Sequence, residues 1–332
     1  MTVLTPFETL EPGEEKHIRE IADVLRRQMA RDYPLGATQR DAHPRHLALL
    51  HATFTIEPQL PAALQVGVFA RSATFDAWVR LSNASSTPQS DLHKDIRGCA
   101  IKLLNVPGPH ISESDESNAQ DFLLVSIPTM PLGTVKLFRD AIALSIGISP
   151  LLFIAKMLLT GKGALLKVLQ RAKTNPASVV GLRYWSTTPY LFGNDRVVKY
   201  TLVPTSGHGN EFPPVLTETY LVDDLEERLD SAEVTFDFKI QLRTDPARMP
   251  VEDAAVEWNE AQAPFVKVAT LRIPQQEFRT AERAQLAEAL AFSPAHARVE
   301  HRPIGAVNRA RMQIYKTLSD FRHARDHREK PV

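Results

Sequence analysis

The chain has 332 residues, of which 43% are hydrophobic and 23% charged, as is typical of a soluble globular protein large enough to bury a cofactor. Lysine plus arginine and aspartate plus glutamate both number 39, so the charge balance excludes the strongly basic character that nucleic-acid binding needs. Cys99 is the single cysteine, which excludes an intramolecular disulfide and a zinc finger, and the N-terminus reads as mature cytosolic sequence, so we expect a cytoplasmic protein.

The first third of the chain predicts a helix followed by short strands. Apolar residues recur at helical spacing over residues 14–33, and Pro34 ends the run. Short runs rich in aliphatic and aromatic residues then predict strands at 48–56, 65–69, 77–81 and 99–104. Strands so close together in the sequence favour an antiparallel barrel over an alternation of strands and helices.

The longest apolar run extends from Ala141 to Ala155 and is interrupted by Pro150, which makes it too short to span a bilayer. Its length favours a helical hairpin buried against the body of the protein. The alternative is a hydrophobic lip that contacts a membrane or admits a lipid, because basic residues follow at 162–173.

The second half of the chain predicts further strands and then helices. Strand-like runs cover 184–190, 197–203, 234–242 and 265–273, and helices are predicted at 222–228, 279–292 and 308–325. We therefore expect a single domain of class α+β over residues 1–332. It consists of a helical arm (1–34), a barrel (35–275) with a helical insertion near 135–175, and C-terminal helices (276–332).

Two residues of the last predicted helix suggest metal chemistry. Arg311 precedes Tyr315 by one helical turn, so both side chains share one face and the guanidinium favours the ionised phenol. A tyrosinate is a strong ligand for ferric haem iron. A second arginine, Arg322, follows seven residues later.

A second cluster lies far upstream and has the composition of the other half of a haem pocket. Arg40 precedes His43 by three residues, Arg80 precedes Ser82 by two, and the segment 95–98 reads Asp-Ile-Arg-Gly. A haem pocket needs an acid/base group on the face away from the tyrosinate and cations for the two propionates. His43 and the arginines supply these groups.

With these motifs in this order, the chain resembles the catalase superfamily, in particular its short haem proteins, which include catalase-related peroxidases and allene oxide synthase-like domains. That family carries Arg-x-x-His, Arg-x-Ser, Asp-x-Arg-Gly and Arg-x-x-x-Tyr in the same order along the chain. The resemblance extends over roughly residues 35–322 and implies an antiparallel β-barrel that encloses ferric haem b.

The resemblance also implies a role for each site residue. His43 and Ser82 match the distal histidine and the serine that orients it, and Tyr315 matches the iron ligand. The remaining matches are to residues that bind the cofactor: Arg40, Arg80 and Arg322 at the propionates, Arg311 beside the tyrosine, and Phe138 near the ring.

One departure from the family concerns the distal asparagine. The equivalent position falls on Val125 or Ser126, and neither side chain can orient a peroxide as an amide does. Loss of such a donor typically costs about two to three orders of magnitude in rate. We therefore expect a peroxidase with weak catalase activity, acting on hydrogen peroxide with an organic reductant.

Other functions and sites stay open at this point. The same pocket suits an enzyme of organic or fatty-acid hydroperoxides, or a haem-binding module without turnover. His43, His46 and His51 could instead form a non-haem metal site, although their spacing fits poorly. Arg97 is interpreted as a structural ion-pair partner. Because the family's longer terminal segments are missing, we expect a monomer or small homo-oligomer.

Overall fold

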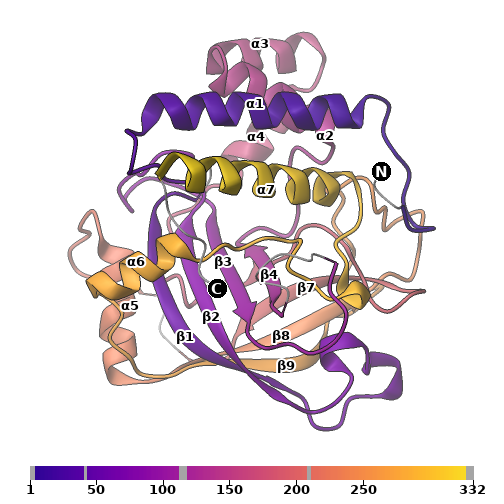
Figure 1. Ribbon diagram of the computed structural model, residues 1–332, viewed down its shortest axis with the longest axis vertical. Helices are drawn as coiled ribbons and strands as arrows, with labels where there is room; N and C mark the ends of the chain where they lie inside the picture. Colours follow the sequence, from indigo (N-terminus) through magenta and orange to yellow (C-terminus); the bar gives the residue numbers. More distant parts are fainter. Residues whose placement is uncertain (1–3, 41–42, 112–117, 208–210, 327–332) are drawn as a thin grey trace.

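An antiparallel barrel forms the body of the protein (Figure 1). The computed structural model describes residues 4–40, 43–111, 118–207 and 211–326. Its strands are β1 (His46–Ile56), β2 (Thr74–Asn83), β3 (Arg97–Leu103), β4 (Gln120–Val125), β5 (Tyr184–Trp185), β6 (Tyr190–Leu191), β7 (Val197–Pro204), β8 (Val234–Leu242) and β9 (Val266–Ile273). They pair in the order β5-β4-β3-β2-β1-β9-β8-β7, and a pairing of β5 with β7 closes the ring, while β6 adds to β7.

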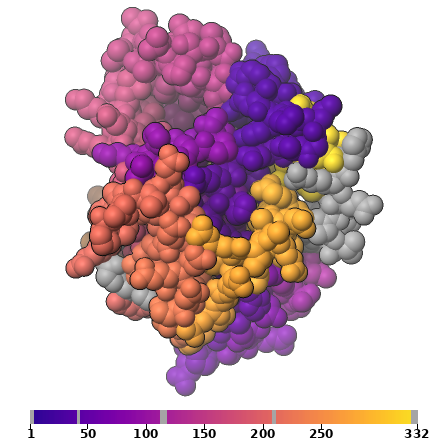
Figure 2. Space-filling model, turned by 90° about the vertical axis from the view of Figure 1, so that its left-hand side faces the viewer, coloured from indigo at the N-terminus to yellow at the C-terminus, as the bar shows by residue number. Residues whose placement is uncertain are grey.

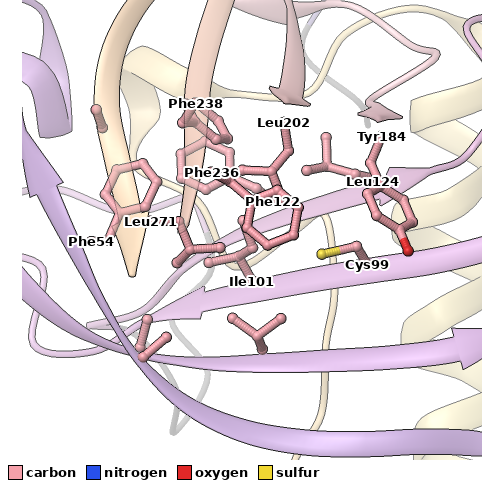
Figure 3. Close-up of a cluster of buried hydrophobic side chains, with 14 of the residues drawn as sticks. Phe54, Cys99, Ile101, Phe122, Leu124, Tyr184, Leu202, Phe236, Phe238 and Leu271 are labelled. Atoms are coloured by element: carbon pink, nitrogen blue, oxygen red, sulfur yellow. The ribbon is translucent and has the colours of Figure 1, made fainter. Parts of the chain in front are cut away.

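The alternating pattern of the strands places aromatic side chains inside the barrel. In β8, Phe236, Phe238 and Ile240 are buried while the residues between them are half-buried, as the two-residue period of a strand requires. Phe238 lies 4.7 Å from Phe122 and 5.1 Å from Phe54, measured between ring centroids. These rings fill the barrel interior (Figure 3).

Two long helices, α1 (Glu14–Asp32) and α7 (Ala306–Asp326), lie side by side across one end of the barrel (Figure 1). Their contact buries Ile21 and Leu25 of α1 against Ala310 and Ile314 of α7. The other helices are α2 (Val135–Ala141), α3 (Pro150–Leu159), α4 (Gly163–Arg171), α5 (Tyr220–Ser231) and α6 (Ala281–Ala289), with short turns of helix η1 (Ala62–Leu64), η2 (Gly67–Phe69), η3 (Ile142–Ile146) and η4 (Val299–His301). Within the described ranges, no helix is long and apolar enough to cross a membrane.

A buried ion cluster fixes the start of α7 to the N-terminal segment. The Arg309 guanidinium lies 2.7 Å from carboxylate oxygens of both Glu8 and Glu14 and 3.0 Å from Glu252. Arg309 is 1% exposed. Burial lowers its pKa, but the hydrogen bonds that it donates to these carboxylates raise the pKa by more, so the net pKa is raised. The cluster therefore sets the position of α7, which carries Arg311 and Tyr315.

The structure confirms the α+β class and the antiparallel barrel, and it differs from the sequence-based expectation at four places. Residues 65–69 are not a strand but contain the turn η2, and β4 was not predicted as a strand. The run 184–190 divides into β5 and β6 around Thr187, whose φ is 58°. The predicted burial of the apolar hairpin is wrong for its outer face, where Leu151 and Leu159 are exposed. The Ser- and Asp-containing segment 111–120 also predicts an exposed loop, of which residues 112–117 lie outside the described residues.

Candidate active site

A cavity of about 330 Å³ lies between α7, strands β2 to β4 and the segment that follows α6. This volume is in the range of small-molecule and cofactor sites. Seven of the residues proposed from the sequence line it, namely Arg40, His43, Arg80, Ser82, Arg311, Tyr315 and Arg322. Phe138 is not among the lining residues and packs instead in the cluster between α1 and α7.

His43 is held in one orientation by β2 and β3. Its Nδ1 lies 2.9 Å from the Ser82 hydroxyl, and its carbonyl accepts a hydrogen bond of 2.7 Å from Arg80. Its φ of 55° is a left-handed conformation that a histidine adopts at a cost. Such strain persists only where neighbouring contacts enforce it, so the two hydrogen bonds define where the imidazole lies.

Gly98 of β3 makes room for this imidazole. A methyl group at Gly98 would come within 2.7 Å of both the His43 ring and the Ser82 hydroxyl, closer than side-chain atoms approach one another. Gly98 belongs to the Asp-Ile-Arg-Gly motif at 95–98, but no role was predicted for it. Its signal was present, since a glycine inside a strand often marks a close approach.

The surroundings of His43 keep its imidazole neutral. Burial, assisted by the charges of Arg80 and Arg311, lowers the pKa of His43 from 6.5 to about 3. A neutral imidazole has one nitrogen free to accept a proton. If Nδ1 donates to Ser82, Nε2 is that base, and it is available at any pH above about 3.

The Arg311–Tyr315 pair lies on α7 as the helical spacing predicted. The guanidinium carbon of Arg311 is 5.5 Å from the centre of the Tyr315 ring. Burial lowers the pKa of Arg311, but the neighbouring Tyr315 and Tyr190 raise it by a larger amount, so that the net pKa is raised. Arg311 is therefore a permanent cation beside the phenol.

Two residues that the sequence analysis missed position Arg311. Its Nη1 lies 3.3 Å from both the Thr188 hydroxyl and the Asn308 carboxamide oxygen. The Asn308 amide donates 2.8 Å to the Pro189 carbonyl, which ties α7 to the β5–β6 connection. Asn308 precedes Arg311 by one helical turn, and that spacing was the available signal.

Three arginines surround a carboxylate that the sequence analysis also missed. Glu288 of α6 lies 3.2 Å from both Arg40 and Arg322. Burial raises its pKa, but the His46 hydrogen bond and the charges of Arg40, Arg322 and Arg80 lower it to about 2. Glu288 therefore balances part of the positive charge at this edge of the cavity.

Comparison with known proteins finds similarity to a peroxidase and to catalases. A curated relative, the catalase-related peroxidase of Mycolicibacterium paratuberculosis (strain ATCC BAA-968 / K-10), is 30% identical over 217 residues, which cover 62% of this chain and 66% of the relative. No family model matches the chain.

Solved catalases share the fold. A fungal catalase superposes with a TM-score of 0.68 at 18% identity, covering 88% of this chain and 60% of its own. A bacterial catalase superposes with a TM-score of 0.63 at 15% identity, covering 98% of this chain and 63% of its own. Catalase A from Saccharomyces cerevisiae superposes with a TM-score of 0.66 at 15% identity, covering 89% of this chain and 62% of its own. The chain has the catalase fold, and its sequence is similar to that of a catalase-related peroxidase.

This chain covers only part of each of these relatives. It spans just under two thirds of the curated relative, at 66%, and 60%, 63% and 62% of the three solved catalases.

The residues of this catalase-like cavity fit haem. A phenol, an imidazole and a group of arginines line one space, which is the donor set that a tyrosinate-ligated haem with two propionates requires. Among the described residues, the buried Nε of Arg80 has no hydrogen-bond partner. A buried guanidinium nitrogen without a partner is costly, and a propionate oxygen would satisfy it.

An apolar side chain faces the cavity at one of the two positions where the resemblance to catalases implies an asparagine. Val125 lines the cavity. The hydroxyl of Ser126 instead accepts a hydrogen bond of 2.9 Å from the Arg97 backbone, which holds it against β3. Of the two positions that the sequence left open, Val125 is therefore the one that faces the cavity.

The alternative non-haem metal site has no support in the geometry. His46 faces Glu288 at 3.6 Å and His51 faces Asp76 at 3.7 Å, so the histidines do not converge with His43. Across the described part of the chain, no group of three or more histidine, cysteine, aspartate or glutamate side chains could hold a metal ion. Arg97 is buried and donates to Asn83 and to the carbonyl of His93, so its contacts are structural.

Proposed function

We propose that this protein is a haem b-dependent peroxidase that cleaves the O–O bond of hydrogen peroxide and has weak catalase activity. The observation that carries the proposal is the presence of Tyr315 with Arg311, and of a neutral His43 with Ser82, on the same cavity. In this proposal the chain forms one haem domain and works in the cytoplasm as a monomer or small homo-oligomer.

Haem b, when bound, supplies the ferric iron at which the peroxide oxygen binds and the O–O bond breaks. The Tyr315 phenolate would hold the iron, and the adjacent Arg311 would stabilise the negative charge of that ligand. Arg40, Arg80 and Arg322 would bind the propionates. Thr188 and Asn308 keep Arg311 in place.

His43 moves the proton. Its Nε2 would accept a proton from one oxygen of hydrogen peroxide and return it to the other oxygen, which would leave as water. Ser82 keeps the Nδ1 proton engaged at 2.9 Å, so that Nε2 faces the substrate. Reduction of hydrogen peroxide to water needs two electrons, which an organic reductant, or a second hydrogen peroxide in the catalase reaction, would supply.

Val125 limits the catalase reaction in this proposal. No amide at this position orients the second peroxide, so oxidation of an organic reductant exceeds the release of oxygen.

The first test is a substrate panel on the haem-loaded protein. A pyridine haemochrome assay should identify haem b, and rapid mixing with peroxide should give a high-valent optical intermediate. Tyr315→Phe should lose haem, whereas His43→Ala should keep haem and consume peroxide more slowly. Full haem retention by Tyr315→Phe would contradict the ligand assignment, and the absence of any intermediate would indicate a haem-binding module without turnover.

A second candidate function is the conversion of organic or fatty-acid hydroperoxides, as in allene oxide synthase-like enzymes. The observation that favours it is the apolar wall of the cavity, which includes Leu123, Leu124, Val125 and Met130. Such a wall accommodates an alkyl chain better than it orients hydrogen peroxide. Faster consumption of lipid hydroperoxides than of hydrogen peroxide in the same panel would select this function.

A further inference from the structure

Helices α3 and α4 form a hairpin that projects from one end of the molecule (Figure 1). In the space-filling view the same segment protrudes beyond α1 at the end of the long axis (Figure 2). On its inner side, Phe153 and Met157 of α3 and Leu166 of α4 pack together in one hydrophobic cluster. The side chains that line the cavity, as far as the structure describes them, come from other elements, so the hairpin has no part in the candidate active site.

The outer side of the hairpin is apolar and exposed. Ile148, Leu151, Leu158 and Leu159 are 71%, 72%, 62% and 89% exposed. In the described structure, seven of the fifteen exposed large apolar side chains lie in the short stretch 148–168. Single exposed leucines are ordinary, but a contiguous patch on a protruding element marks an interaction surface.

A cationic rim borders this patch. The sequence contains no aspartate or glutamate between Asp140 and Asp195, although the whole chain has as many acidic as basic residues. Lys156 pairs with Asp140 at 2.7 Å. The four basic residues that follow it are exposed and have no ion-pair partner within the described residues, namely Lys162, Lys167, Arg171 and Lys173.

The ends of α3 are suited to a medium with little water. The Ser149 hydroxyl accepts a hydrogen bond from the Leu151 amide, and Pro150 at the first turn has no amide hydrogen to satisfy. At the other end, the Thr160 hydroxyl donates 2.8 Å to the Lys156 carbonyl. These contacts leave few backbone groups without partners at the tip of the hairpin.

The chemistry of the patch identifies its partner. Its exposed apolar residues are leucine, isoleucine and valine, whereas protein interfaces favour tyrosine, tryptophan and other directional anchors. A second copy would bring two cationic rims together, which disfavours self-association. Aliphatic side chains above a basic rim suit acyl chains beneath anionic headgroups.

We infer that the α3–α4 hairpin docks the protein on an anionic phospholipid membrane, with Leu151, Leu158 and Leu159 inserted between the headgroups. Lys162, Lys167, Arg171 and Lys173 then contact lipid phosphates at the surface. The inference is independent of the proposed peroxidase function, because the hairpin lies apart from the cavity.

Co-sedimentation of the haem-loaded full chain with vesicles tests this inference. Vesicles of roughly equal parts phosphatidylglycerol and phosphatidylcholine should bind the protein, and pure phosphatidylcholine should bind it much less. Binding should weaken as salt rises from about 0.05 to about 0.5 M, because salt screens the basic rim. No binding to the anionic vesicles would overturn the inference.

Matched variants separate the apolar contribution from the charged one. The double variant Leu151→Ser/Leu159→Ser should weaken partition at least about tenfold, since each leucine loses an apolar environment. Its control, Leu35→Ser/Val215→Ser, removes side chains that are 76% and 73% exposed elsewhere and should bind as the unmodified chain does. Lys162→Gln/Lys167→Gln should lose about tenfold on anionic vesicles only, while Lys16→Gln/Lys316→Gln should not. Equal losses in variants and controls would contradict the inference.

Dye fluorescence and analytical ultracentrifugation distinguish membrane docking from self-association. Leu158→Cys, labelled with a nitrobenzoxadiazole dye, should give a blue-shifted, brighter emission on anionic vesicles, and labelled Val215→Cys should not. Cys99 is buried and does not compete for the label. Analytical ultracentrifugation reports the alternative: oligomers that dissociate in the leucine variant, without vesicle binding, would assign the patch to self-association and refute the membrane assignment.

Discussion

At the scale of single residues, Gly98 controls where the His43 imidazole lies. A Cβ at this position would lie 2.7 Å from the His43 ring and 2.7 Å from the Ser82 hydroxyl. The ring must therefore leave Ser82 if Gly98 becomes alanine. We expect Gly98→Ala to keep its haem and to consume peroxide about ten- to a hundredfold more slowly, because the displaced base is misaligned.

The measurement is stopped-flow peroxide consumption on variants with equal haem content. Gly207→Ala is the control, because a Cβ there meets nothing within 4 Å. Unchanged turnover in Gly98→Ala would show that His43 acts from another position or has no role in proton transfer.

Val125 offers a gain-of-function experiment at the same scale. Its side chain lines the cavity at one of the two positions where the resemblance to catalases implies an asparagine, so Val125→Asn introduces that amide. We expect oxygen release from hydrogen peroxide to rise at least about tenfold, because an oriented donor stabilises the reacting oxygen. An oxygen electrode measures the effect.

Val125→Leu is the matched variant, since it adds bulk without a hydrogen-bond donor. If both variants release oxygen at the unmodified rate, the absent amide does not limit the catalase reaction.

At the scale of elements, the buried Arg309 cluster fixes α7 and with it the Arg311–Tyr315 pair. Arg309 contacts Glu8, Glu14 and Glu252 at 2.7 to 3.0 Å. Removal of the guanidinium leaves buried carboxylates without a counter-ion, which typically costs about 3–5 kcal/mol. We therefore expect Arg309→Met to lower the free energy of unfolding by that amount in urea titrations at pH 7.

Lys316→Met is the control on the same helix. Its ion pair with Asp320 is 2.6 Å long but 76% and 43% exposed, and exposed pairs contribute at most about 1 kcal/mol. A similar small loss for Arg309→Met would mean that packing of α1 on α7, and not the ion cluster, sets the position of α7.

The elements also show which parts of the fold the sequence could predict. Apolar and polar residues alternate strictly over 234–242, and the structure has β8 there. This strand was predictable because the local sequence alone determines which side chains face the core. The run 65–69 looked equally strand-like, yet Gly67 has a φ of 56° and faces His301. That contact joins residues over two hundred positions apart, and no local pattern reports it.

The same distinction holds for the candidate site. His43, Arg80, Arg311 and Tyr315 were predictable because family motifs place them in order, and all four line the cavity. Glu288 and Thr188 were missed because their roles come from contacts between distant segments. The exposure of the α3 outer face was mispredicted for a related reason: apolar periodicity reports that a face needs a partner, but not that the partner lies outside the chain.

At the scale of the whole molecule, charge is balanced in number but not in space. The chain has 39 acidic and 39 basic residues, yet the hairpin segment carries only basic ones. The arginine-rich edge of the cavity receives compensation from Glu288, whereas the hairpin receives only that of Asp140. Uncompensated charge on a protruding element attracts a partner from solution, and compensated charge at a cavity stabilises the fold and its cofactor.

The stability of the whole fold should depend on pH through a second buried histidine, His301. Its Nε2 accepts a 3.0 Å hydrogen bond from the Val68 amide, and burial lowers its pKa from 6.5 to about 3. The unfolded chain binds a proton at this side chain below pH 6.5, while the folded chain does not until about pH 3. The contribution of neutral His301 is therefore fully present above pH 6.5 and is lost as the pH falls towards 3.

Protonation of His301 in the unfolded chain lowers the free energy of unfolding by about 1.4 kcal/mol for each pH unit below 6.5, which is about 2 kcal/mol between pH 6.5 and pH 5. His301→Gln keeps a hydrogen-bond acceptor for Val68 but does not titrate. We expect it to be less stable than the unmodified chain at pH 7 and to lose about 2 kcal/mol less when the pH is lowered to 5. Urea unfolding of both proteins at the two pH values measures the difference. Parallel losses would mean that His301 is protonated in the folded chain at pH 5, against the sign derived from its burial.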